Sequence, residues 1–281
     1  MKVSEHVEKL IQSRPYKYTY KHTLVRDVKK LGIWEMDIED VTSAYIRDTV
    51  DMVRNHNSRR RLYITARSIF KELDKCQDLP VLESISRIYQ FPEQEHLDYL
   101  INKSKYRLQL FLCMYGGLRL GESCAVTPNK LEGNYLRVDE AFSQDGKHLG
   151  SPKTVGRVLL PEWLADEVRR MTPDQYWKMG TTTKKVSSSI YKISRFKGAE
   201  QLTGGKPINP HMLRHWYATD MIKRGISPEV VRRQMRHARI ETTMRVYVQV
   251  NSKDLEASVP TRFVQNQSTS GNVIPLRFTN A

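Results

Sequence analysis

Apolar residues recur at helical spacing through the first 80 residues of the chain. Val3–Ser13 and Tyr16–Leu31 have the pattern of two amphipathic helices, and Val41–Asn55 has that of a third. Arg59–Leu73 predicts a fourth helix, with Asn57-Ser58 as its cap. We therefore expect residues 1–80 to form a helical domain.

The pattern changes near residue 92, after a stretch bracketed by Pro80 and Pro92 that we interpret as a linker, residues 81–91. Tyr106–Gly116 is strongly apolar and predicts a buried core helix. Three short segments have the pattern of strands in a small antiparallel sheet: Tyr135–Phe142, residues 147–152 and Val158–Leu160. Further helices are predicted at residues 93–102, 162–171, 187–201, 210–225 and 228–235, and a short one at 253–258. The predicted fold class is mainly α (α+β), with a mostly helical second domain, 92–264, and a polar tail, 265–281.

The chain is strongly basic, with 46 Lys and Arg against 31 Asp and Glu. Residues 92–281 carry most of the excess, with 29 basic and 18 acidic side chains, against 17 and 13 in residues 1–91. Such an excess indicates a polyanionic partner, and nucleic acid fits better than a membrane. No apolar run approaches a membrane span, and no signal peptide is apparent, so we expect a cytoplasmic protein.

Cofactor motifs are absent from the sequence. The three cysteines, at positions 76, 113 and 124, have no metal-like spacing and are expected to be reduced. Neither a phosphate-binding loop nor a dinucleotide fingerprint occurs. The sequence implies no metal and no nucleotide cofactor.

Candidate chemistry concentrates between Asn209 and Tyr247. Asn209-Pro210 is a typical helix start, so His211 and Arg214, three residues apart, share one face of the first turn. His237 follows a second helix, and Tyr247 lies ten residues beyond it. A phenol, a guanidinium and imidazoles suit phosphodiester chemistry. The alternative from these residues alone is a DNA-binding helical segment with Tyr247 as a half-buried anchor.

Two upstream segments add cations. Arg119 follows a double glycine at the end of the core helix, and Glu122 is placed to orient it, although an ordinary helical ion pair is the alternative. Residues 151–157 predict a hairpin with Lys153 at its turn, where a lysine can donate a proton to a leaving group. Lys147 is the second candidate for that donor.

Two helices carry clusters suited to DNA contact, or to simple exposure to solvent. The candidate contact residues are Arg59, Arg60, Arg61 and Arg67 in the first domain, and Lys184, Lys185, Ser188, Lys192 and Arg195 in the second.

The chain resembles the tyrosine recombinases, the phage integrase family, over nearly its whole length. The resemblance rests on five segments in the family's order: Gly117-Leu-Arg-Leu-Gly-Glu122, Pro152-Lys-Thr154, His211-Met-Leu-Arg-His215, Arg236-His237, and Thr242-Thr243 with Tyr247. Arg236 stands where the family commonly has a small residue. The family's architecture implies a core-type DNA-binding domain, 1–80, and a catalytic domain, 92–264, that form a clamp around DNA.

The resemblance implies a role for each motif residue. Tyr247 would attack the scissile phosphate and form a 3′-phosphotyrosyl linkage. Arg119 and Arg214 would hold the phosphate oxygens, and Lys153 would protonate the leaving 5′ oxygen. His211 and His237 would assist as acid, base or hydrogen-bond donor, with Glu122 in a supporting role.

The resemblance also implies how the protein works as an assembly. Strand exchange would need neither ATP nor metal, because the covalent linkage conserves the bond energy. Four protomers would synapse two core-type attachment sites, with a monomer or weak dimer in solution and a possible directionality factor. The segment after Tyr247, residues 253–264, would dock on a neighbouring protomer.

Three alternatives remain open from the sequence. A Xer-type resolvase and a type IB topoisomerase-like enzyme share the chemistry. A protein of another class, a sequence-specific DNA clamp without catalysis, shares the architecture. The intact set of motif residues argues against the clamp without catalysis, and two separate domains with an interaction-prone tail favour recombination over topoisomerase activity. The ten-residue spacing from His237 to Tyr247 mildly disfavours the Xer-type resolvase, so we expect an integrase that inserts or excises phage or mobile-element DNA.

Overall fold

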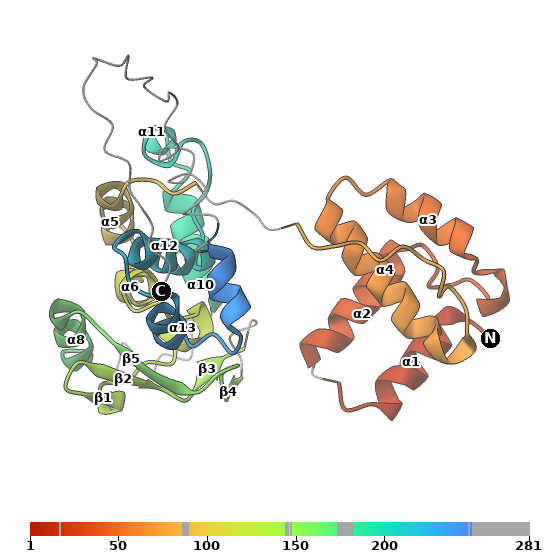
Figure 1. Ribbon diagram of the computed structural model, residues 1–281, viewed down its shortest axis with the longest axis horizontal. Helices are drawn as coiled ribbons and strands as arrows, with labels where there is room; N and C mark the ends of the chain where they lie inside the picture. Colours follow the sequence, from red (N-terminus) through yellow and green to blue (C-terminus); the bar gives the residue numbers. More distant parts are fainter. Residues whose placement is uncertain are drawn as a thin grey trace, which may run out of the picture. The chain divides into compact units, whose positions relative to one another are not determined.

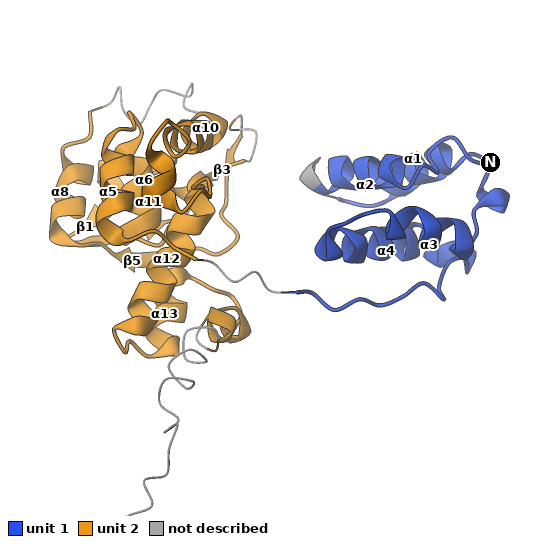
Figure 2. Cartoon of the chain, turned by 90° about the horizontal axis from the view of Figure 1, so that it is seen from above, with its two compact units in different colours: residues 1–87 blue, residues 88–281 orange. Residues whose placement is uncertain are grey.

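The computed structural model describes residues 1–16, 18–85, 90–143, 146, 148–172, 183–246 and 248. The chain divides into two compact units, residues 1–87 and 88–281 (Figure 2). Helices dominate both units, and within the described residues every named strand belongs to the second (Figure 1). The predicted mainly helical fold with a small antiparallel sheet is confirmed.

The first unit contains four α-helices within its described residues: α1 (Val3–Ser13), α2 (Tyr18–Lys30), α3 (Ser43–Asp51) and α4 (His56–Phe70), with 3-10 turns at Ile38–Asp40 and Lys71–Leu73. Each lies where the periodicity predicts a helix. The start of α4 differs from the prediction, because Asn55 rather than Asn57-Ser58 accepts the capping bond, from the backbone N–H of Ser58 at 2.9 Å.

The core of this unit follows from the helical spacing of its apolar residues. Val3, Val7 and Leu10 of α1 are all buried, at intervals of four and three residues. Leu62 and Phe70 of α4 are fully buried against the same core.

The second unit is built around α6 (Arg107–Tyr115). The helices α5 (Gln94–Asn102), α7 (Leu120–Ser123), α8 (Glu162–Arg169) and α12 (Pro210–Lys223) all contact it. Its residues 110–114 are buried, as the continuous apolar run predicts. The described residues of this unit also include α10 (Thr183–Ile193), α11 (Ala199–Thr203), α13 (Pro228–Met235) and a 3-10 turn at Pro128–Lys130, and residues 240–246 are helical.

The strands form a bent antiparallel ribbon rather than one sheet. A three-stranded sheet has the order β1 (Leu131–Glu132), β2 (Tyr135–Val138), β5 (Gly156–Leu159). A two-stranded sheet pairs β3 (Ala141–Phe142) with β4 (Leu149–Gly150), and the backbone N–H of Ser143 bonds to the carbonyl of His148 beyond it.

This topology corrects the predicted hairpin at residues 151–157. That segment links β4 to β5, which pair with different strands, so it contains no hairpin turn. Five residues, 151–155, lie opposite only two, 139–140, since Ala141 pairs with Gly150 and Val138 with Gly156. Lys153 is the middle residue of this large bulge. The sequence showed the turn-forming residues Pro152 and Gly156 but not the register that assigns them to a bulge.

A second correction concerns α10. The helix predicted at residues 187–201 already begins at Thr183 and ends at Ile193, so Ser187 lies inside it, and α11 follows as a separate helix. Lys147, Tyr247, the helix predicted at 253–258 and the tail 265–281 lie outside the described residues. Among the described helices, none has the length and apolar character needed to cross a membrane.

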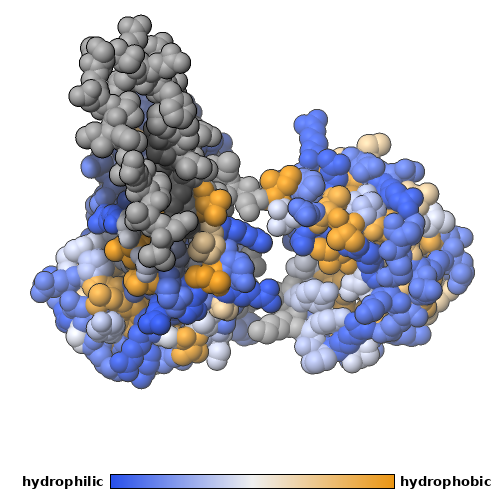
Figure 3. Space-filling model, in the orientation of Figure 1, coloured by the Kyte–Doolittle hydropathy of each residue, from blue (hydrophilic) through white to orange (hydrophobic). Residues whose placement is uncertain are grey.

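Hydrophilic side chains cover most of the visible face of each unit, with isolated apolar patches between them (Figure 3).

Candidate active site

The loop between α6 and α7 holds the first arginine. Gly117 has φ of 63°, and a Cβ on it would lie 2.8 Å from the Sδ of Met235 and from the Tyr217 ring, so only glycine fits. The double glycine thus brings this loop against α12 and α13. At Gly121, a Cβ would lie 2.4 Å from the carbonyl oxygen of Phe142, which shows how closely α7 approaches β3.

Arg119 is the N-cap residue of α7, and Glu122 orients it. The Arg119 Nη1 donates to Glu122 Oε1 at 2.8 Å, and the Arg119 backbone N–H donates to Glu122 Oε2 at 2.7 Å. The carboxylate is buried, at 1% exposure, whereas the Arg119 side chain keeps 28%. The predicted pairing is confirmed, and it leaves part of the guanidinium accessible.

Arg214 lies near the start of α12, and its guanidinium approaches the same carboxylate that binds Arg119. Asn209 caps that helix by accepting the N–H of Met212 at 3.0 Å, as predicted. The buried Arg214 guanidinium donates to the carbonyls of Gly117 and Met235, and Nη1 lies 4.0 Å from Glu122 Oε2. Burial, and then the charge of Arg119, lowers the pKa of Arg214 to about 9, so it remains a cation at neutral pH.

His237 follows α13 and is held by Thr243 of the helical segment 240–246. Its Nδ1 lies 2.9 Å from the Thr243 Oγ1, and Thr243 is fully buried. Burial, and then Arg214 and Arg119, lowers the pKa of His237 to about 4, so the ring is neutral at pH 7. In the tautomer in which Nδ1 accepts from the Thr243 hydroxyl, Nε2 carries the hydrogen and can donate it to a phosphate oxygen.

His211 and His215 form a pair on the same face of α12. Their Nε2 atoms lie 3.1 Å apart, and their rings meet edge to face. Withdrawal from water by the surrounding protein lowers both pKa values, that of His215 to about 4. The charges of Arg214, Arg119 and Lys153 lower the pKa of His211 further. Both rings are thus neutral at pH 7, and one donates to the other.

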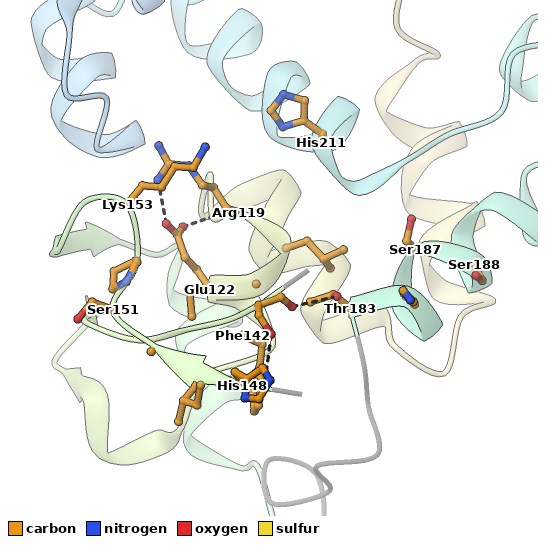
Figure 4. Close-up of a pocket in the computed structure, with 18 residues that line it drawn as sticks. Arg119, Glu122, Phe142, His148, Ser151, Lys153, Thr183, Ser187, Ser188 and His211 are labelled. Carbon is orange, nitrogen blue, oxygen red and sulfur yellow. Dashed lines mark hydrogen bonds and ion pairs between the residues drawn. The ribbon is translucent and has the colours of Figure 1, made fainter. Parts of the chain in front are cut away.

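Arg119 and His211 line two neighbouring cavities, the larger of which is drawn in Figure 4. Arg119, Lys153 and His211 line a cavity of about 900 Å³, and a smaller one beside it is lined by Arg119, His211 and Arg214. Three sequence segments that are far apart therefore deliver cations and imidazoles to the same place. Tyr247 and Lys147 lie outside the described residues, so the structure does not choose between the two lysine candidates.

The pocket extends from the cations to α10. Lys184, Ser187 and Ser188 line it on that side (Figure 4). Two other predicted contact residues of α10, Lys185 and Lys192, are exposed. Arg195, which follows the end of α10, is also exposed and donates to the Tyr191 hydroxyl at 2.6 Å.

The arginines predicted to contact DNA from α4 already have partners inside the first unit. Arg60 donates to the Leu82 carbonyl at 2.9 Å, and Arg61 to the fully buried Asp27 at 2.8 Å. Arg67 donates to the Leu79 carbonyl at 3.3 Å, and Arg59 lies 3.8 Å from Asp51. All four are partly buried, so part of each guanidinium is committed to the fold.

Three residues in this region had no role assigned from the sequence: Thr243, His215 and Arg236. The sequence did place His215 directly after Arg214 in one motif, and Thr243 in the motif that follows His237. Arg236 was noted only as a departure from the family pattern, yet its guanidinium is buried and bound to Glu122. Within the described residues, no cluster of His, Cys, Asp and Glu is arranged to hold a metal ion.

The helical first unit, the mostly helical second unit with its small antiparallel sheet, and the cationic site of the second unit can now be compared with known proteins. The sequence profile of the phage integrase family matches residues 82–254. The chain therefore belongs to the phage integrase family, and it is a tyrosine-type site-specific recombinase that acts on DNA.

Individual relatives agree. The tyrosine recombinase XerA of Pyrococcus furiosus is 26% identical over 208 residues, which cover 71% of this chain and 70% of the relative. The Tn1549 transposon integrase in complex with transposon right-end DNA shares the fold, with a TM-score of 0.72, 16% identity, and coverage of 92% of this chain and 100% of that chain. A lambda integrase dimer bound to a core site has a TM-score of 0.65, 16% identity and 98% coverage of both chains.

Proposed function

We propose that the pocket around Arg119 is the active site, and that Tyr247 is the nucleophile. The Tyr247 phenol oxygen forms a bond to the scissile phosphorus while the bond from phosphorus to the 5′ oxygen breaks. The phenol loses its proton to His211, and the 5′ oxygen gains one from Lys153. Attack by a 5′ hydroxyl of the partner strand reverses these steps and releases the tyrosine.

The two arginines stabilise the charge that develops on the phosphate. Planar guanidinium groups suit the non-bridging oxygens of a pentavalent phosphorane. The electrostatic stabilisation that they provide is larger in a site partly shielded from water than in bulk solvent. Glu122 and backbone carbonyls fix both groups before DNA arrives, so little reorganisation is needed. The observation that carries this proposal is that Arg119 and His211 line two neighbouring cavities, of which the larger is also lined by Lys153 and the smaller by Arg214.

The neutral histidines fit the same scheme. A base must be unprotonated to take the phenol proton, and the lowered pKa of His211 keeps it so. His237, with hydrogen on Nε2, donates to a non-bridging oxygen. A bound phosphate brings negative charge and raises both pKa values.

We assign residues 1–80 to core-site DNA binding, 81–91 to the linker, 92–264 to catalysis and 265–281 to a tail. The basic face of α10 contacts DNA phosphates next to the scissile one. Two attachment sites are synapsed by a homotetramer, in which residues 253–264 dock on a neighbouring protomer. A directionality factor that selects between insertion and excision is a candidate further partner.

The biological reaction we infer is integration and excision of mobile-element DNA. The long structural matches to a transposon integrase and a phage integrase support it. The second candidate is Xer-type resolution, which the 26% identity to XerA favours. A two-plasmid assay separates them: an integrase joins sites on separate plasmids, whereas a resolvase acts preferentially on two sites within one.

The active-site assignment is tested by arginine substitution. A core site is first selected by binding from a random-sequence duplex pool, and cleavage of its nicked form is measured in single turnover at saturating protein. Arg119→Lys and Arg214→Lys should each slow cleavage by about 10²- to 10³-fold, the usual effect of losing an oxyanion donor. The exposed Arg239→Lys serves as the matched control. Cleavage by both active-site variants within a few-fold of wild type would refute the assignment.

A further inference from the structure

Arg236 occupies a backbone position that normally favours glycine. It follows α13 with φ of 50° and ψ of 46°, in the left-handed region. The backbone N–H of Arg236 donates to the carbonyl of Arg233, and the backbone N–H of His237 donates to the carbonyl of Arg232, each at 3.0 Å. This is a Schellman motif with Arg236 at the C′ position, where a side chain introduces strain.

The side chain runs inward rather than into solvent. Arg236 is 4% exposed, and its Cδ passes so close to β5 that a Cβ on Gly156 would lie 3.1 Å away. Its Nη2 donates to Glu122 Oε2, the oxygen that also accepts the Arg119 N–H. One side chain thus joins the turn before His237, the strand after the Lys153 bulge, and the carboxylate that orients Arg119.

The charges at this point are unbalanced. Three guanidinium groups, those of Arg119, Arg214 and Arg236, surround the single buried carboxylate of Glu122. The Nε and Nη1 of Arg236 are buried and have no hydrogen-bond partner within the described residues. Strain, a buried charge and unpaired donors on one residue would all be avoided by a glycine. Such costs concentrate where function requires them.

We propose that Arg236 is a positioning residue for DNA cleavage. Its guanidinium compensates the Glu122 carboxylate, so that the charge of Arg119 is available to the phosphate. Its stem fixes the turn that carries His237 against β5. Gln234 reinforces this contact, since its side chain exchanges hydrogen bonds with the Leu159 backbone at 3.1 and 2.7 Å. This inference rests on the proposed role of the Arg119 pocket.

The test compares Arg236→Gly, Arg236→Lys and the exposed control Arg233→Ala. Glycine relieves the left-handed backbone, so Arg236→Gly should fold, with an unfolding midpoint near that of wild type. We expect DNA affinity to change less than threefold but the single-turnover rate of adduct formation to fall about 10- to 100-fold, the scale of a small misplacement in an active site. Arg236→Lys keeps the positive charge but not the planar, bidentate guanidinium, so its cleavage rate should lie between those of Arg236→Gly and wild type.

Chemical rescue distinguishes positioning from a purely structural role. Arg236→Gly leaves a buried, guanidinium-shaped space next to Glu122, so millimolar guanidinium chloride should restore much of the rate, whereas equal potassium chloride should not. In a Glu122→Gln background, adding Arg236→Gly should have little further effect on the single-turnover rate of adduct formation. A wild-type rate for Arg236→Gly, or slow cleavage without guanidinium rescue, would overturn the proposal. Absence of cleavage by the wild type would instead refute the proposed function.

Discussion

Neutralising Glu122 should both destabilise the second unit and slow DNA cleavage. The carboxylate is 1% exposed and accepts bonds from Arg119 and Arg236, with Arg214 at 4.0 Å. Glu122→Gln preserves the shape of the side chain and its acceptor oxygen but removes the negative charge. Three guanidinium groups then repel one another with no anion among them.

The size of the effect follows from burial. Removing one partner of a buried ion pair costs about 3–5 kcal/mol, because it leaves a charge uncompensated in a medium of low dielectric constant. For a unit in the size range of 150–250 residues, each kcal/mol lowers the melting midpoint by about 2–4 °C. We therefore expect Glu122→Gln to melt about 6–20 °C below wild type.

Tryptophan fluorescence can follow the second unit alone. In a Trp34→Phe background, the remaining tryptophans all lie in residues 88–281. Glu229→Gln is the matched control, because Glu229 also binds two arginines, Arg232 and Arg233, but at the surface. Solvent screens that cluster, so its loss should leave the midpoint nearly unchanged.

An added anion provides a second readout. Sulfate can bind among the uncompensated guanidinium groups, so it should raise the midpoint of Glu122→Gln more than that of wild type, by linkage. A Glu122→Gln midpoint within about 2 °C of wild type, which is below about 1 kcal/mol for this size, would refute the electrostatic account of the site.

Three further results are expected. Lys153→Ala should cleave ordinary DNA slowly but approach the wild-type rate on a substrate with sulfur at the 5′ bridging position, because a thiolate leaves without a proton. Equal defects on the two substrates would exclude Lys153 as the general acid. Burial lowers the pKa values of His215 and His237 from 6.5 to about 4, so the unfolded chain binds protons at these rings more readily than the folded protein does. Their contribution to stability is therefore complete above pH 6.5. Solvent reaches part of both rings and screens the effect, so a contribution of about 1–2 kcal/mol each should be lost as the pH falls from 6.5 to 4. Denaturant titrations should show a shallower fall for His237→Asn. Lys184→Ala should reduce the slope of log K against log salt by about 1 in binding titrations, and an unchanged slope would exclude a phosphate contact.

The sequence predicted the helices well because their signals are local. Amphipathic spacing placed α1 at its observed bounds, and Asn209-Pro210 marked the start of α12. Arg119 with Glu122, and His211 with Arg214, share short segments whose relative geometry is set by the helix itself. Their convergence was expected from the family resemblance rather than from spacing.

Features that depend on contacts between distant segments were not predictable in the same way. The register that makes residues 151–155 a bulge is set by the flanking pairs Val138–Gly156 and Ala141–Gly150, which no local pattern encodes. Arg236 is unremarkable as a surface arginine in a basic chain, and only the fold brings it to Glu122, 114 positions away. The same is true of the α4 arginines, whose partners, Asp27 among them, lie elsewhere in the first unit.

The central claim, that Tyr247 becomes covalently bound to DNA, is tested most directly by trapping. Wild type and Tyr247→Phe are incubated in EDTA, without ATP, with a nicked suicide duplex carrying the selected core site. A denaturation-resistant adduct formed by wild type alone, with the nucleotide mapped to the Tyr247 peptide by mass spectrometry, is the predicted result. Wild type that binds this duplex without forming an adduct, or an adduct on another residue, would contradict it.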